Sequence, residues 1–189
     1  MNSAIVLSDR ARAIVLALPW IVFGWQVIGA GATFRPMPGQ RGASPLAQLI
    51  SFAFVALLVR QQQVDLNIML VATGAIGLLA SLVLFEWARR AVRGRLFSYI
   101  FSSDAPEFIC RDGPFAYIRN PFYASYLLAM VSTAVMMPSA FRFLVVLAMV
   151  AYFTAAAVYE ERKFARSPVA HEYAQYKATT GRFLPRLRT

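Results

Sequence analysis

The segment from Asp112 to Tyr123, with the sequence DGPFAYIRNPFY, holds the residue types best suited to binding a ligand. Pro121 fits the first turn of a helix, where its missing N–H is harmless. The free backbone amides of such a helix start attract anions or carboxylates, and Arg119 adds a positive charge beside them. Tyr123 and Tyr126 lie three residues apart and so share one face of that helix. The segment predicts either a cradle for a polar ligand or a loop whose tyrosines anchor a helix end at a membrane interface.

A second candidate is the carboxylate pair Glu160–Glu161, which follows a long apolar stretch. Successive helical residues point about 100° apart, so one carboxylate can face a pocket while the other meets water. A carboxylate near a helix C-terminus opposes the helix dipole and therefore favours a cationic partner. Arg162, Arg119 or the amino group of a ligand would provide that partner. The two glutamates therefore either form part of a binding site or make ion pairs at a membrane surface.

The sequence gives little support to metal or nucleophile chemistry. Cys110 is the only cysteine and His171 the only histidine. This excludes an internal disulfide and a metal cage built from several Cys or His ligands. His171 has no partner at ligand spacing, so we expect it at the surface. We expect no metal site and no Ser–His–Asp arrangement.

The candidate site residues must be positioned by the long apolar stretches of the chain. Hydrophobic residues make up 59% of the 189-residue chain, more than a soluble domain of this size can bury. The blocks cover approximately residues 13–32, 45–59, 66–87, 122–137 and 143–159. The first and third have the roughly 20 residues that a spanning helix needs, whereas the other three are short and are expected to tilt or to lie partly outside the hydrocarbon. We predict an all-α integral membrane protein with about five transmembrane helices.

Two local features indicate how these helices pack. Pro138 and Ser139 separate the last two blocks by only a few residues, which predicts a tight antiparallel helical hairpin. Thr73, Gly77 and Ser81 lie four residues apart on the third block. Small residues at this spacing predict a close seam between two helices.

The basic residues predict an orientation in the membrane. Of the 19 lysines and arginines, four lie on one side of a five-span arrangement, namely Arg10, Arg12, Arg60 and Arg142. The others lie on the opposite side, which the positive-inside rule assigns to the cytoplasm. We expect an outside N-terminus and a cytoplasmic C-terminus in a bacterial inner membrane. Because the basic residues lie between apolar blocks and form no patch with aromatics, we expect no nucleic-acid partner.

The chain divides into residues 1–88, with three spans, and residues 89–189, which carry the candidate site. The polar connection 89–121 and the tail 160–189 both fall on the predicted cytoplasmic side. Functional residues are concentrated in such connecting segments. We therefore predict a site built from the loop and the tail, capping the last helical hairpin.

The stretch GPFAYIRNPFY, residues 113–123, resembles the GPYRYVRHPxY signature of the isoprenylcysteine carboxyl methyltransferase family and of related integral membrane phospholipid methyltransferases. The family's Glu-Glu pair, tyrosine-containing stretch and terminal Arg-x-x-Pro match residues 160–161, 172–176 and 182–185 in order and spacing. The likeness covers about the last half of the chain, and the first three spans match only as generic apolar helices. It implies a membrane methyltransferase that uses S-adenosylmethionine, releases S-adenosylhomocysteine and takes a lipophilic acceptor among membrane lipids.

The resemblance also implies roles for single residues. Glu160 would hold the amino group of the cofactor, and Arg119 and Glu160 would be the catalytic residues. The residues implied to bind the cofactor are Glu107, Phe108, Ile109, Cys110, Phe115, Asn120, Pro121, Phe122, Tyr123, Glu160 and Glu161. Methyl transfer from a sulfonium depends mainly on orientation and desolvation, which suits a site with few titratable groups.

Three positions depart from the family pattern. Asn120 replaces a histidine and can bind but cannot take up a proton near neutral pH. Ala116 and Ala156 replace arginines, the second thought to face the substrate carboxylate, which weakens the case for a prenylcysteine acceptor. A lipophilic carboxylate, a thiol and a lipid amine stay open as acceptors. Two other functions also stay open: an NADPH-dependent membrane reductase of the sterol-reductase type, and an inactive membrane scaffold.

Overall fold

The computed structural model describes residues 9–34, 66–93 and 108–186. Within these ranges the chain forms helices and no β-strand, apart from one isolated parallel bridge between Ile118 and Gly181. The elements are α1 (Asp9–Thr33), α3 (Ile68–Ala91), the 3₁₀ turn η1 (Gly113–Ala116), α4 (Pro121–Met136), α5 (Ala140–Phe164) and α6 (Ala170–Thr179). The predicted all-α class is therefore confirmed for the described part of the chain.

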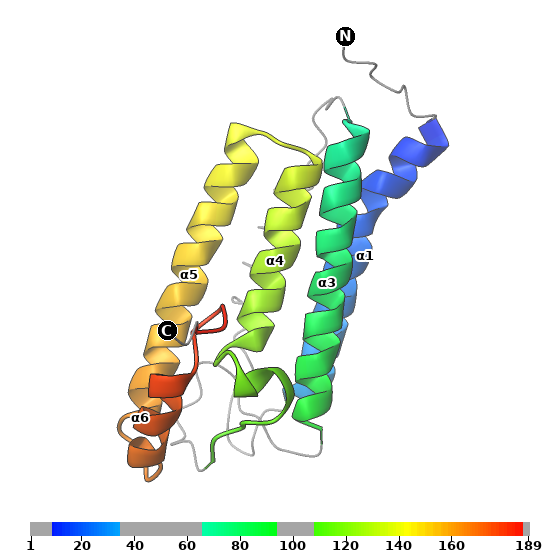
Figure 1. Ribbon diagram of the computed structural model, residues 1–189. Coiled ribbons are helices and arrows are strands. Elements are labelled where there is room, and N and C mark those ends of the chain that lie inside the picture. Colours follow the sequence, from blue (N-terminus) through cyan, green and yellow to red (C-terminus); the bar gives the residue numbers. More distant parts are fainter. Residues whose placement is uncertain (1–8, 35–65, 94–107, 187–189) are drawn as a thin grey trace.

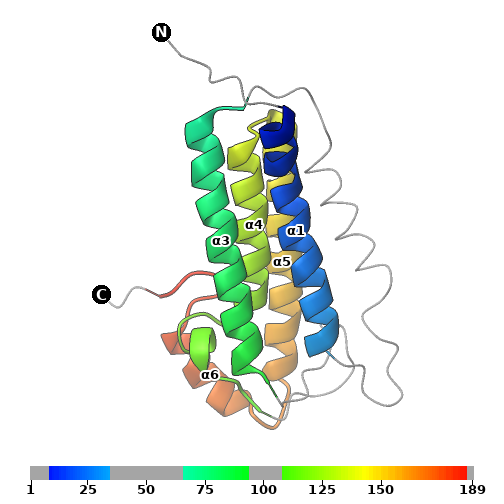
Figure 2. The same cartoon turned by 90° about the vertical axis from the view of Figure 1, so that its right-hand side faces the viewer.

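The four long helices form a bundle with the short elements gathered at one end (Figures 1 and 2). α4 packs along α3 and contacts α1 and α5, and it runs opposite in direction to the other three. The ends of α1, α3 and α5 and the start of α4 lie together with η1 and α6 (Figure 1). We call this end of the bundle the basic end because the last turns of its helices carry Arg89, Arg90, Arg162, Lys163 and Lys177. It is the side that the charge count predicts to be cytoplasmic.

Three of the described helices, α1, α3 and α5, are long and apolar enough to cross a membrane. α4 has 16 residues, which gives a length of about 24 Å against about 30 Å of hydrocarbon. The prediction of a short fifth block was wrong, because α5 runs for 25 residues from Ala140 to Phe164. Hydropathy missed its last turns because they are polar although they continue the helix. The second predicted span, residues 45–59, lies outside the described residues.

The tight hairpin between α4 and α5 is confirmed. Ser139 caps α5 by accepting a hydrogen bond from the backbone N–H of Arg142 at 3.2 Å. The buried guanidinium of Arg142 donates to the carbonyl oxygen of Met137 at 3.0 Å, at the end of α4. Because α4 is shorter than α5, its first residue lies well before the end of α5, and α5 extends beyond it toward the basic end (Figure 1).

The seam predicted on the third block lies between α3 and α4. A Cβ at Gly74 would come within 2.6 Å of the backbone oxygen of Ser132, and one at Gly77 would collide with the Ser132 hydroxyl. Ser81 is fully buried and donates to the carbonyl of Ser125 at 2.9 Å. Thr73 is exposed, so the predicted spacing of four was wrong at that position. A spacing of four drifts around a helix of 3.6 residues per turn, so Gly74 takes the place of Thr73.

Candidate functional site

The loop before α4 and the C-terminal tail pair with each other at the basic end. The backbone N–H of Arg119 donates to the carbonyl of Gly181 at 2.8 Å, and that of Asn120 donates to the carbonyl of Arg182 at 3.1 Å. Gly181 in turn donates to the carbonyl of Tyr117 at 3.2 Å. A Cβ at Gly181 would collide with the backbone oxygen of Leu184, so the turn there requires glycine. We call residues 117–120 and 176–182, together with Glu161 of α5, the clasp.

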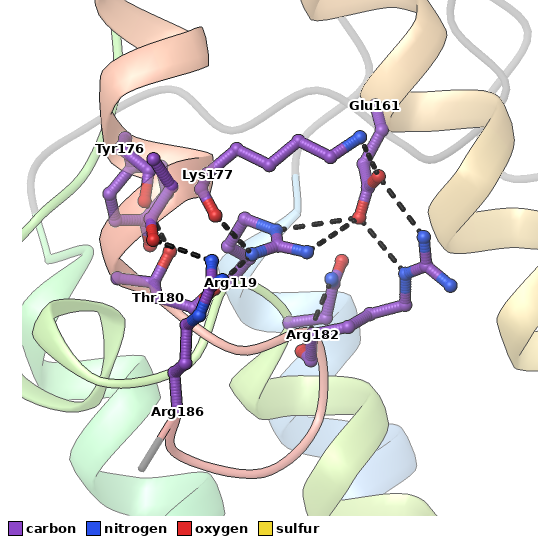
Figure 3. A network of polar contacts seen from close by, with 9 residues as sticks. Arg119, Glu161, Tyr176, Lys177, Thr180, Arg182 and Arg186 are labelled. Carbon is purple, nitrogen blue, oxygen red and sulfur yellow. Dashed lines mark hydrogen bonds and ion pairs between the residues drawn. The ribbon is translucent and has the colours of Figure 1, made fainter. Parts of the chain in front are cut away.

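Glu161 is the centre of the clasp (Figure 3). Its carboxylate lies 3.2 Å from Arg119 Nη2, 2.8 Å from Lys177 Nζ and 3.0 Å from Arg182 Nε. Arg119 also donates to the carbonyls of Lys177 and Thr180 at the end of α6. The hydrogen bond to Glu161 raises the pKa of Arg182 above its usual value. A buried carboxylate needs such compensation, and the ion pairs tie α5, the loop and the tail together.

Two tyrosines fasten α6 to the rest of the basic end. Tyr176 donates its hydroxyl to the carbonyl of Phe115 at 2.6 Å, and burial raises the pKa of Tyr176 to about 12. Arg111 lies over the Tyr176 ring, with 5.6 Å between its guanidinium carbon and the ring centroid. Tyr173 stacks on Phe164 of α5 with ring centroids 4.4 Å apart. These contacts give a physical reason for the tyrosines of the 172–176 stretch.

Glu160 contacts the start of α4, whereas its neighbour Glu161 contacts the cations of the clasp. The Glu160 carboxylate accepts a hydrogen bond from the Tyr123 hydroxyl at 2.9 Å. Tyr123 stacks on Phe153 of α5 at 5.1 Å, and Tyr126 contacts the same ring at 5.8 Å. The two tyrosines therefore share one face of α4, as predicted. Glu160 is half-buried between the start of α4 and the last turns of α5.

Other predicted site residues lie on the α3 side of the α4 start. Cys110, Phe115 and Phe122 are buried together with Phe85 of α3. Phe122 makes edge contacts with Phe85 at 5.6 Å and with Phe115 at 6.2 Å. Successive residues of a helix point about 100° apart, which separates Phe122 from Tyr123.

The remaining predicted residues are placed as follows. Pro121 is buried and begins α4, and the side chain of Asn120 donates to the carbonyl of Arg182 at 3.4 Å. Ile109 is half-buried and Phe108 is exposed. Glu107 lies outside the described residues. The predicted cofactor residues thus form two groups, one on each side of the first turn of α4.

Three residues that shape this region were not among the predicted site residues. Lys177 and Arg182 hold Glu161, and Phe153 carries the two tyrosine contacts. Arg182 was visible as the first residue of the Arg-x-x-Pro motif, whereas Lys177 and Phe153 belong to no motif. His171 is exposed, as predicted. No group of three or more His, Cys, Asp or Glu residues that could hold a metal ion occurs in the part of the chain described here.

Fold and site together define a helical membrane protein with a polar clasp at one end of its bundle. A family model of phospholipid methyltransferases matches residues 66–167, from the start of α3 to just beyond α5, and the chain belongs to this family. The match covers more than half of the chain and confirms the resemblance seen in the sequence. Membership indicates a membrane methyltransferase. No curated protein and no solved structure matches the chain significantly.

Proposed function

We propose that the protein transfers a methyl group from S-adenosylmethionine to a lipophilic acceptor at the cytoplasmic face of a bacterial inner membrane. Family membership supports methyl transfer in a membrane. The observation that carries the proposal to this site is the pair formed by Glu160 and Tyr123, 2.9 Å apart at the start of α4. It offers a partly accessible carboxylate, aromatic rings and a helix N-terminus within one small region.

These groups suit the chemistry of the cofactor. A carboxylate binds the amino group of an amino acid, the first turn of α4 attracts a carboxylate, and aromatic faces attract a cation such as a sulfonium. Glu160, the α4 amides and the rings of Tyr123 and Phe153 would take these roles. Asn120 and the apolar group of Cys110, Phe115 and Phe122 are proposed to hold other parts of the same molecule. When bound, S-adenosylmethionine supplies an already activated methyl group.

The protein's own residues would then bind, orient and exclude water. Asn120 contributes hydrogen bonds and no proton transfer. Arg119 is occupied by Glu161 and by two carbonyls of the tail, so we propose that it acts by holding the clasp in place. Glu161 is held by the same cations, which leaves Glu160 as the carboxylate that meets the cofactor.

The surrounding architecture suggests separate routes for the two substrates. We propose that the acceptor, a lipophilic carboxylate, thiol or lipid amine, reaches the site from the bilayer past α4 and α5. The soluble donor would arrive from the cytoplasm at the basic end. In this arrangement residues 1–88 serve as membrane helices, residues 89–189 carry the catalytic core, the N-terminus is outside and the C-terminus is cytoplasmic.

Calorimetric titration of the detergent-purified protein with S-adenosylhomocysteine tests this proposal. We expect micromolar binding that Glu160→Gln weakens by about 1.5–3 kcal/mol, because the substitution removes a charge-assisted hydrogen bond. Glu172→Gln is the matched control, since Glu172 of α6 is an exposed carboxylate that pairs with Arg111. Its affinity should equal that of the unchanged protein.

Two outcomes would reject the proposal. If folded protein binds NADPH and no S-adenosylhomocysteine, the reductase interpretation replaces it. If neither cofactor binds, the protein is an inactive scaffold, for which Asn120 in place of the family histidine would be the first explanation. Equal affinities for the Glu160→Gln and unchanged proteins would remove Glu160 from the site while leaving the cofactor in place.

A further inference from the structure

The clasp contains more positive charge than its carboxylate neutralises. Among the described residues, Arg119, Lys177 and Arg182 each lie within 3.2 Å of Glu161. Arg119 and Arg182 approach the same oxygen, Oε1. Within the described ranges these three cations share one carboxylate, an excess of two positive charges. The neighbouring Glu160 takes part in none of these three ion pairs: its carboxylate accepts from Tyr123, and the charge of Lys163 acts on it.

Accessibility divides the cluster into a buried and an open part. The side chains of Glu161 and Arg119 are 6% and 8% exposed, whereas those of Arg182 and Lys177 are 33% and 50% exposed. Like charges repel strongly where they are shielded from water, so the buried part favours a further anion. The open part can bind one, since an ammonium has three donors and a guanidinium five. Figure 3 shows Lys177 and Arg182 converging on Glu161 from different directions.

We propose that the clasp binds a phosphate group through Lys177 and Arg182, and that this phosphate belongs to the headgroup of an anionic phospholipid. A guanidinium fork together with an ammonium is the donor set that suits phosphate oxygens. The location favours a lipid, because the clasp lies at the basic end, where the membrane-spanning helices α3 and α5 finish (Figure 1). Basic residues at such a boundary attract anionic headgroups. The site would bind lipid whether or not the protein transfers methyl groups.

The test is lipid binding to the full-length protein in detergent, measured by native mass spectrometry with phosphatidylglycerol as the probe. Diacylglycerol, which lacks the phosphate, is the lipid control, and inorganic phosphate is the soluble probe. The variants are Lys177→Gln and the double variant Lys177→Gln/Arg182→Gln. The charge-matched control is Arg162→Gln/Arg166→Gln, because both arginines are exposed, whereas the ion pairs of the clasp with Glu161 come from Arg119, Lys177 and Arg182.

We expect the double clasp variant to bind phosphatidylglycerol at least about tenfold more weakly and the control variant to be unchanged. Binding of inorganic phosphate alone, with the same dependence on the clasp, would keep the phosphate site and identify a soluble ligand. Equal weakening in clasp and control variants, or equal binding of diacylglycerol, would overturn the proposal. If the double variant does not fold, the single variant Lys177→Gln tests the site instead, because it leaves both arginines paired with Glu161. It should then bind more weakly than Arg162→Gln, and equal affinities would refute the site.

Discussion

α4 has two faces that are built in opposite ways. Toward α3 it presents Ser132 to Gly74 and Gly77 and the carbonyl of Ser125 to Ser81, so the two backbones come close together. Toward α5 it presents the rings of Tyr123 and Tyr126, and at the basic end the Tyr123 hydroxyl meets the carboxylate of Glu160 on α5. In a membrane, helices associate through close packing and interhelical hydrogen bonds, which the α3 face supplies. The α3 face therefore fixes the position of α4, while the α5 face carries the groups that we propose to contact the cofactor.

The strongest test of this comparison is Gly74→Leu on the α3 face. The new side chain would meet the backbone of Ser132 and the side chain of Met136, so we expect a loss of about 3 kcal/mol in stability. Thermal unfolding in detergent measures it. Gly24→Leu is the matched control, because Gly24 of α1 has nothing within 4 Å of an added Cβ. Similar melting temperatures for the two variants would show that α4 is not closely packed against α3 at Gly74.

A smaller effect is expected from Tyr123→Phe on the α5 face. The ring that stacks on Phe153 stays, and only the hydroxyl that bonds Glu160 is lost. Affinity for S-adenosylhomocysteine should fall by about 1 kcal/mol, with the melting temperature nearly unchanged. Tyr126→Phe provides the control, since Tyr126 contacts the same Phe153 ring. A large loss of stability in Tyr123→Phe would mean that this face, too, mainly holds the bundle together.

An effect of similar size is expected for the hydrogen bonds that link three helices. Gln26 of α1 donates to Ser81 at 2.8 Å, and Ser81 donates to the Ser125 carbonyl. Ser81→Ala should cost about 1 kcal/mol of stability, because it leaves the buried amide of Gln26 without its acceptor. The double variant Ser81→Ala/Gln26→Leu should recover most of that loss in the same unfolding assay. Additive losses would contradict the link.

Much of the fold was predictable because it depends on local sequence. Apolar length predicted α1 and α3, Pro138 and Ser139 predicted the hairpin, and Pro121 marked the start of α4. Two predictions were wrong because hydropathy and a fixed residue spacing do not follow the helix in every case. The polar end of α5 was missed by hydropathy, and Thr73 was misplaced by a spacing that does not match the helical period.

For the site, the sequence determined the residue types and only the tertiary structure decided their partners. That two adjacent glutamates would face different surroundings follows from the helical repeat. Which of them meets Tyr123 and which meets the clasp depends on how the tail returns to the loop, through contacts such as Arg119 with Glu161, 42 residues apart. Lys177 and Arg182 reach Glu161 only because the backbone pairs Gly181 with the loop before α4. Side-chain types are local, whereas a charge cluster depends on chain segments that meet only in the folded protein.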